Sequence, residues 1–366
     1  MRRLIILALL IFISIPIASA NQLLVLSAPS YRTATGDFIN DELAVRLSAQ
    51  GDLGARLFQA ISKADDVAID IAFIEEIQDL SDGYSYINSA GEKVAVAELP
   101  SATIWLETLR RSLANKNVLS LPYGNPDSAF LKKIAPTEYR FYQAIAATRL
   151  SGFIGETLKS VDSVHPTNRS SGELARVLHK SNRSELKRLY GAVAAPEVLD
   201  LRLQLAKILN PEISSEALPL LAKDLRAALL ANSNKLRVAV GNYTITAAKY
   251  DLPITVINDY SLPVSINLKA QPDNTRVIIG NLKVITIPAS SQLQIKLPVE
   301  VLASGETNLK IKILSTAGKE IGKAGVIPLR LAVISPVTTW FTTGMAVILL
   351  IAAVMQSIRR VKRRKK

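Results

Sequence analysis

The sequence predicts a mixed chain in which a helix-rich, partial α/β domain is followed by an all-β sandwich of the immunoglobulin type and by one C-terminal transmembrane helix. Three observations predict this order. Strand-like and helical segments alternate before residue 235, short alternating stretches rich in Val, Ile and Thr follow, and a long uncharged stretch stands near the C-terminus. We therefore divide the chain into segments 1–20, 21–235, 236–334, 337–358 and 359–366.

Composition and charge exclude several classes of function. The chain has 366 residues, enough for about two domains. Its formal net charge is +13, but seven of the basic residues lie in 359–366 and two are Arg2 and Arg3, so that +4 remains elsewhere. No basic stripe with interleaved aromatic residues is visible there, and we expect no nucleic-acid partner. The absence of cysteine excludes disulfides and cysteine-type zinc sites, and in an exported chain it favours a bacterial source.

The first 20 residues have the three parts of a secretory signal peptide. Two arginines precede an apolar run over 4–17, and the small residues of 18–20 form a cleavage site of the A-x-A type. The apolar run is shorter than the roughly 20 residues that span a bilayer as a helix. We therefore expect 1–20 to be removed, with an uncleaved anchor as the alternative.

The predicted transmembrane helix, 337–358, carries no charge and would be roughly 33 Å long. Trp340 lies where aromatic residues gather at a membrane interface, and the basic tail 359–366 follows the helix directly. Basic residues stay on the cytoplasmic side of a membrane. We expect a single-pass plasma-membrane protein with an extracytoplasmic N-terminal domain and a cytoplasmic C-terminus, which contacts membrane lipid through this helix and tail.

In the distal domain, 21–235, predicted strands alternate with predicted helices. The strands are 23–26, 67–71 and 117–122. The helices are 41–63 with a break at Gly51, 102–114, one that begins at 128, 138–159, 172–190, 196–209 and 212–232. Strands that alternate with helices favour parallel α/β units. So few strands are not enough for a complete eight-stranded barrel, which takes about 250 residues.

The segment 236–334 is predicted as a sandwich because its short strands alternate apolar and polar residues. The strands are 238–247, 252–258, 264–270, 277–279, 282–287, 293–299, 309–314 and 326–333. Turn residues such as Gly280-Asn281 and Ser304-Gly305 separate them. Seven or eight strands in about 100 residues are typical of the immunoglobulin architecture, although its Cys…Trp…Cys pattern is absent. Such a module near a membrane would serve as a spacer or a binding platform.

The candidate site is a loop that follows a predicted strand, with the sequence LPYGNPD over 121–127. Parallel α/β folds bind ligands at the carboxyl ends of strands, so Tyr123 and Asn125 are candidate ligand-binding residues. Asp127 and Asp70 are candidate catalytic residues, because two carboxylates in one cleft serve as acid and base or as metal ligands. The alternative is that Asp127 caps the following helix and that the prolines and glycine only shape the loop.

Other motifs of catalysis are absent from the sequence. The two histidines, His165 and His179, match no metal-ligand spacing, and we expect no metal. There is no G-x-S-x-G elbow, no P-loop and no G-x-G-x-x-G, and we expect no cofactor.

Several segments together resemble a family of uncharacterised actinobacterial membrane proteins that carry a domain of unknown function. In the distal half these are DFINDELA over 37–44, Gly51-Asp52-Leu53, 67–70, WLETL over 105–109 and the LPYGNPD loop. In the membrane-proximal half they are LPITVIND over 252–259 and VEVLASGETNLKIKILSTAGKEIG over 299–322. The resemblance is clearest over 37–127 and 236–366. It implies a gene beside that of the lipid II flippase, and hence cell-wall synthesis or flippase proteins as partners.

The chain departs from the family in length. Family members typically carry a further β-domain and a fuller α/β domain similar to a sugar-processing barrel, and no catalytic residues are known for them. We therefore expect a non-enzymatic envelope scaffold or binding protein linked to cell-wall biogenesis. The alternative is a hydrolase or deacetylase of wall glycans, which requires Asp70 and Asp127 to meet in an open cleft. A ligand sensor or an accessory protein of a transporter is a third hypothesis.

Overall fold

The computed structural model describes residues 22–166, 169–280, 282, 284–332 and 336–363, and in its last helix only the side chains of 343–357. The predicted signal peptide, 1–20, lies outside these residues, as do 364–366 of the basic tail. The chain divides into two compact units. Unit 1 comprises Met1–Arg32, Asp37–Ser170 and Asn210–Ile213, and unit 2 comprises Thr33–Gly36, Ser171–Leu209 and Ser214–Lys366. The predicted domain boundary at 235 stays a prediction.

Unit 1 is built on a parallel sheet with the order β1-β2-β5-β6. The strands are β1 (Leu23–Leu26), β2 (Asp66–Ile69), β5 (Asn117–Ser120) and β6 (Lys159–Ser160). From β2 onwards, each strand pairs with the preceding strand of this sheet, as in part of a (β/α) barrel. The prediction of parallel α/β units is confirmed, and β6 is an additional strand that was not predicted.

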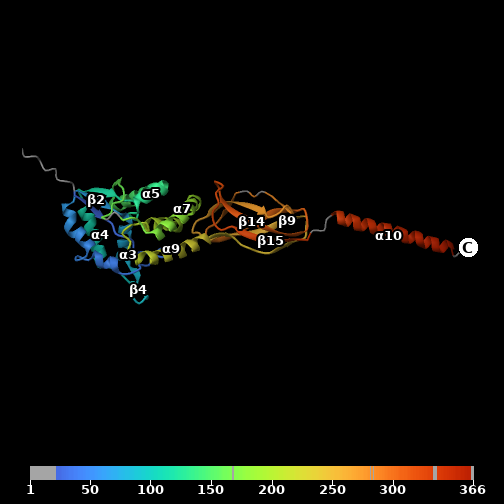
Figure 1. The fold of residues 1–366 in the computed structure, drawn as a ribbon, viewed down its shortest axis with the longest axis horizontal. Coiled ribbons are helices and arrows are strands. Elements are labelled where there is room, and N and C mark those ends of the chain that lie inside the picture. The colour runs from blue at the N-terminus through green and yellow to red at the C-terminus, as the bar shows by residue number, and fades with distance from the viewer. Residues whose placement is uncertain (1–21, 167–168, 281, 283, 333–335, 364–366) are drawn as a thin grey trace, which may run out of the picture. The chain divides into compact units, whose positions relative to one another are not determined.

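Helices connect these strands (Figure 1). Before β2 lie α1 (Glu42–Leu47), α2 (Asp52–Ala55), the π-helical turn Arg56–Ala60 and the 3-10 turn Ile61–Lys63. Between β2 and β5 lie α3 (Ile71–Asp82) and α4 (Pro100–Ser112), and before β6 lie α5 (Ser128–Ile134) and α6 (Pro136–Ile154). Trp105 of α4 is fully buried and packs edge-to-face on Phe73 of α3. Burial of such large side chains is the main source of stability in this unit.

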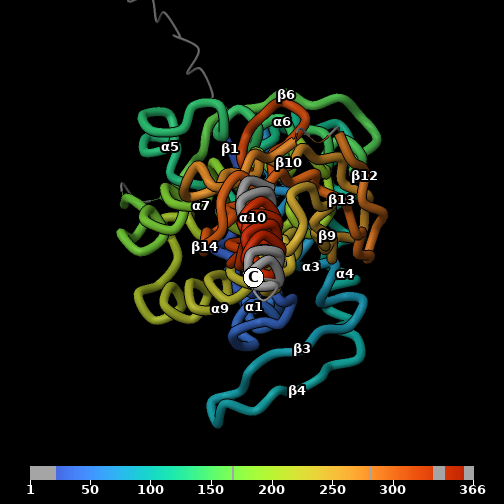
Figure 2. The backbone as a smooth tube through the Cα atoms, turned by 90° about the vertical axis from the view of Figure 1, so that its right-hand side faces the viewer, coloured from blue at the N-terminus to red at the C-terminus, as the bar shows by residue number. Residues whose placement is uncertain are grey.

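The sequence did not reveal α3 or the antiparallel hairpin formed by β3 (Tyr84–Ile87) and β4 (Lys93–Val96). Figure 2 shows this hairpin extending away from α1 and α4. Its turn is closed by Asn88, whose side-chain oxygen accepts the backbone N–H groups of Ala90 and Glu92. Tyr84 is its one buried strand residue, and therefore neither strand shows the apolar pattern of a core strand.

Unit 2 begins with three helices, α7 (Glu173–Val193), α8 (Pro196–Lys207) and α9 (Ala217–Ser233). Pro196 occupies the first turn of α8, where a missing backbone N–H costs nothing. Asn210 delays the start of α9 relative to the predicted residue 212, because its side-chain oxygen accepts the backbone N–H of Glu212 in a turn.

Two antiparallel sheets follow in unit 2, with the orders β12-β10-β14-β15-β8 and β11-β13-β9-β7; β15 and β8 alone pair in parallel. Alternate residues of the long strands are buried, which confirms a β-sandwich-like part (Figure 1). The strands are β7 (Leu236–Val238), β8 (Tyr243–Ile245), β9 (Lys249–Asn258), β10 (Val264–Pro272), β11 (Val277–Ile279), β12 (Ile285–Ile287), β13 (Ser291–Val301), β14 (Gly305–Ser315) and β15 (Gly325–Leu331).

One predicted strand of the sandwich, 238–247, was wrong as a single element. Val238 ends β7 and 243–245 form β8, and these two strands lie in different sheets. Gly241 lies between the two strands, and a glycine in a strand-like pattern commonly marks such a break.

The last helix, α10, extends over Pro336–Arg363. In the part of the chain that the structure describes, which for the side chains of α10 is 343–357, no helix is both long enough and apolar enough to cross a membrane. The predicted transmembrane segment 337–358 lies partly outside those side chains.

Candidate functional site

The candidate site of unit 1 lies where the four parallel strands end. Because their carboxyl ends point in one direction, the segments that follow them meet at the same edge of the sheet. These segments are 27–32 after β1, 70–76 after β2, 121–127 after β5 and 161–166 after β6.

Asp70 is a structural residue at this edge, and it lies after β2 rather than within a strand as predicted. It is the N-cap of α3, and its Oδ1 atom accepts the backbone N–H of Ala72 at 3.0 Å. The same atom accepts the backbone N–H of Gly124 at 2.9 Å, and the Ser27 hydroxyl lies 3.5 Å from Oδ2. With 1% of its surface exposed, Asp70 joins the segments that follow β1, β2 and β5.

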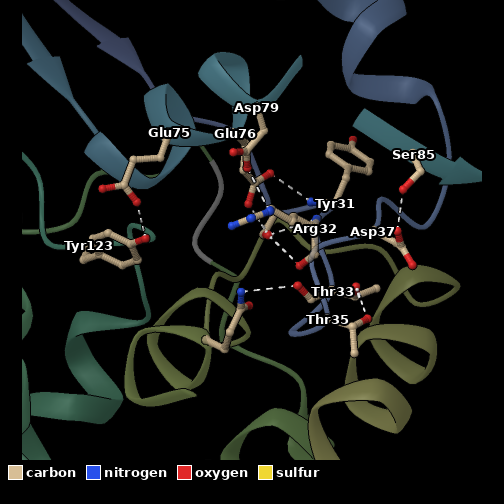
Figure 3. A network of polar contacts seen from close by, with 12 residues as sticks. Tyr31, Arg32, Thr33, Thr35, Asp37, Glu75, Glu76, Asp79, Ser85 and Tyr123 are labelled. Atoms are coloured by element: carbon tan, nitrogen blue, oxygen red, sulfur yellow. Dashed lines mark hydrogen bonds and ion pairs between the residues drawn. The ribbon is translucent and has the colours of Figure 1, made fainter. Parts of the chain in front are cut away.

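Tyr123 is buried, and its hydroxyl donates to Glu75 Oε2 at 2.5 Å (Figure 3). Arg149 of α6 forms an ion pair with Glu75 Oε1 at 2.8 Å, and its guanidinium lies 5.5 Å from the centre of the Tyr123 ring. Burial and the neighbouring Glu75 raise the pKa of Tyr123 well above its ordinary value. The Tyr123 hydroxyl is therefore protonated and committed to Glu75.

Glu76 and Asp79 hold the segment that follows β1 against α3 (Figure 3). Glu76 is 3% exposed and accepts the Ser30 hydroxyl and, at 3.2 Å, the backbone N–H of Tyr31. Asp79 forms an ion pair with Arg32 at 2.8 Å. These carboxylates therefore fix the path of the chain.

Asp127 caps α5, because its Oδ1 atom accepts the backbone N–H of Phe130 at 2.9 Å. The structure thus shows the cap that the alternative predicts, and the catalytic role of Asp127 stays a prediction. Asn125 joins the loop after β5 to the segment after β6: its side chain donates to the Val164 carbonyl at 2.8 Å and accepts the Val164 N–H at 3.1 Å. The Asn210 side chain donates to the Gly124 carbonyl at 3.0 Å.

A cavity of about 340 Å³ opens beside these residues. Its volume is within the range of small-ligand sites. Asn125 is the predicted site residue that lines the cavity. Asp70, Tyr123 and Asp127 are not among the lining residues. The lining consists of Leu23, Leu24, Val25, Ser27, Ala28, Pro29, Arg46, Arg56, Asn125, Val164, His165, Pro166, Asn210 and Glu212.

His165 is the lining residue with unsatisfied hydrogen-bonding groups. Among the described residues, neither of its buried ring nitrogens makes a hydrogen bond of ordinary geometry, although the Pro126 backbone is close enough to affect its pKa. Burial lowers the pKa of His165 below its ordinary value. The imidazole is therefore neutral at pH 7 and offers one donor and one acceptor.

Sequence reasoning considered His165 only as a metal ligand and did not single out Ser27. Both follow a parallel strand closely, which was the available signal. Within the described ranges, no three His, Asp or Glu side chains are grouped so that they could hold a metal ion. The expectation of no metal stays a prediction.

Solved structures similar to the chain share little of it. Alpha-2-macroglobulin of Escherichia coli, from domain MG7 to the C-terminus, is 9% identical with a TM-score of 0.22, and the match covers 26% of this chain and 16% of that one. WR4, an MSP family member of C. elegans, is 13% identical with a TM-score of 0.21 and coverages of 27% and 99%. The E. coli chaperone DraB is 12% identical with a TM-score of 0.20 and coverages of 26% and 53%.

A comparison with the curated proteins found no match. The model of DUF6049, a family of unknown function, matches residues 158–365, which is more than half of the sequence. The chain therefore belongs to the DUF6049 family.

Proposed function

We propose that this protein is a non-enzymatic binding protein of the cell envelope, held in the plasma membrane by 337–358. In this proposal the two units lie outside the cytoplasm, the tail 359–366 lies inside, and the sandwich of unit 2 is of the immunoglobulin type. Proteins of cell-wall synthesis or a lipid flippase are the proposed partners, in line with the family resemblance.

The observation that carries the binding role is that the acidic groups at the strand ends are already engaged. Asp70 and Asp127 cap helices, Glu75 pairs with Arg149 and Tyr123, and Glu76 holds the segment after β1. Glycan hydrolysis requires two carboxylates that face the substrate across the scissile bond. The cavity beside them is lined by apolar groups, an imidazole, amides, two arginines and one carboxylate, Glu212, and not by a pair of carboxylates.

Attachment to the membrane is supported by the sequence of 337–358. Its 22 uncharged residues are enough for a bilayer, and seven basic residues follow. Carbonate extraction and protease digestion of sealed cells test this. Full-length protein should stay with the membrane, and its two units should be digested from outside. Release by carbonate would contradict the anchor.

Affinity capture of the full chain from its own host, read by mass spectrometry, tests the binding role. The matched control exchanges 337–358 for an unrelated transmembrane helix, so that partners retained by both proteins bind outside the membrane. In parallel, wall glycans are incubated with the wild type, Asp70→Asn and Asp127→Asn. Glycan cleavage by the wild type that Asp127→Asn abolishes, with an unchanged unfolding midpoint, would overturn the non-enzymatic proposal.

A further inference from the structure

β1 is an edge strand whose outer side is unpaired in the described sheet. The carbonyl of Leu26 accepts the N–H of Asp70 on the β2 side. In a parallel strand, successive residues direct their N–H and C=O groups to opposite sides. Val25 and Ser27 therefore direct theirs away from β2, and among the described residues these groups have no strand partner.

The cavity follows this free edge. Its lining includes Leu23, Leu24 and Val25 of the strand and continues through Ser27, Ala28 and Pro29. Neighbouring residues of a strand point to opposite faces of the sheet. The cavity contacts residues that point to each of the two faces. It therefore lies along the edge of the sheet, where backbone groups are available, and not over one face.

The charges around the cavity are balanced. Arg46 forms two hydrogen bonds of 2.8 Å with the carboxylate of Asp52, and Arg56 lies 3.4 Å from the same carboxylate. Asp52 itself does not line the cavity, and Glu212 is the carboxylate among the lining residues. Two cations are thus matched by two anions, and His165 is neutral, so this edge favours an uncharged occupant.

The remaining lining favours a peptide over a sugar. Carbohydrate sites commonly offer an aromatic ring, whereas the lining residues include no Phe, Tyr or Trp. The apolar surfaces of Leu24, Pro29 and Val164 can receive side chains instead. A peptide that binds by strand addition uses backbone donors and acceptors at strand spacing, and its side chains contact small apolar surfaces beside them.

We propose that the free edge of β1 binds an extended, uncharged peptide segment of a partner protein as an added strand, with His165 as a hydrogen-bonding side chain. This proposal rests on the binding role proposed above and specifies its ligand. Val25 and Ser27 supply the backbone contacts, and His165 supplies a donor and an acceptor that make no hydrogen bond of ordinary geometry within the described residues.

The test uses the full chain in detergent and a fluorescein-labelled peptide of sequence TVTVTV with blocked ends. Fluorescence anisotropy measures the binding of the peptide. We expect saturable binding that is weakened at least tenfold by Val25→Pro, which removes an outward N–H but no β1–β2 bond. The control Val25→Ala keeps that N–H and should bind within about twofold of the wild type. His165→Ala should weaken binding several-fold, and N-methylation of alternate peptide residues should abolish it.

Circular dichroism and thermal unfolding show whether Val25→Pro is folded, and His165→Ala tests the site independently. Equal binding by wild type, Val25→Pro and His165→Ala would overturn the proposal, as would preference for a neutral oligosaccharide over the peptide. If the protein binds no peptide but still captures partners from its host, strand addition is overturned and the binding role stands. Failure of both experiments would overturn the binding role itself.

Discussion

The backbone N–H of Gly124 donates to Oδ1 of Asp70 at 2.9 Å, and 54 residues of chain separate the two. Asp70 also caps α3, so that one buried carboxylate fixes a helix start and the loop after β5. These contacts give Asp70 a structural role at this edge of the sheet, and its catalytic role stays a prediction.

Asp70→Ala should lower the free energy of unfolding by about 2–3 kcal/mol, because it removes an N-cap and leaves the buried Gly124 N–H unpaired. Urea unfolding at pH 7, followed by far-UV circular dichroism, measures this. The exposed Asp82→Ala, at the end of α3, serves as the control and should change stability by less than about 0.5 kcal/mol. An unchanged midpoint for Asp70→Ala would argue against the structural role.

Gly54→Ala should destabilise the protein although Gly54 lies in a helix, where replacing glycine by alanine normally increases stability. An added Cβ would lie 1.9 Å from the carbonyl oxygen of Ser48. We expect a loss of about 1–3 kcal/mol. Gly152→Ala in α6 is the matched control: nothing lies within 4 Å of the added Cβ, and stability should rise by about 0.5–1 kcal/mol. Thermal unfolding separates the two, and equal effects would contradict the steric argument.

Trp105→Ala should cost about 3–5 kcal/mol, because it empties a fully buried site against Phe73. Trp105→Phe should cost less, since the ring contact is partly kept and only the 3.3 Å hydrogen bond from Nε1 to the Leu53 carbonyl is lost. Urea midpoints of the two variants check the ranking. Equal costs for the two variants would mean that the lost hydrogen bond accounts for the effect and that the ring packing contributes little.

Glu197 of α8 should make the stability of unit 2 depend on pH. Its carboxylate accepts the N–H and hydroxyl of Ser261 at 3.1 and 2.9 Å and pairs with Lys235 at 3.1 Å. Burial alone would raise the pKa of Glu197, but hydrogen bonds from its own backbone, Ser261 and Lys235 lower it from 4.5 to about 2. The folded-state pKa is depressed, so this stabilisation is present above pH 4.5 and is lost as pH falls through about 2.

Glu197→Gln should therefore lower the free energy of unfolding at pH 7 by about 1 kcal/mol, allowing for solvent around the pair. The difference from the wild type should vanish towards pH 2. Urea unfolding at pH 7, 4 and 2.5 measures it. A difference that is constant across this range would show that charge plays no part.

The strands of unit 1 could be predicted where apolar runs are bounded by polar residues, and β1 has the predicted residues 23–26. The run VAIDIAFIEEI was ambiguous, because continuous apolar residues suit a buried strand and a buried helix equally. Asp70 resolves it as an N-cap, so β2 ends at Ile69 and α3 begins at Ile71. The two-residue strand β6 leaves no pattern at all.

The loop 121–127 follows a strand as predicted, and Asn125 lines the cavity beside it. The binding and catalytic roles of the candidate residues stay predictions. Whether a carboxylate is free or engaged depends on partners far away in the sequence, as with Asp70 and Gly124. The availability of His165 likewise arises from burial without a partner, which no local pattern encodes.

The sequential strand order of unit 1 bears on how the chain acquires its fold. Because β2, β5 and β6 each pair with the preceding strand of the sheet, no strand waits for a neighbour made later. A chain that emerges with its N-terminus first can therefore extend the sheet one strand at a time, closing one crossover before the next begins. Until the last strand joins, each intermediate grows at one edge only, the edge opposite β1.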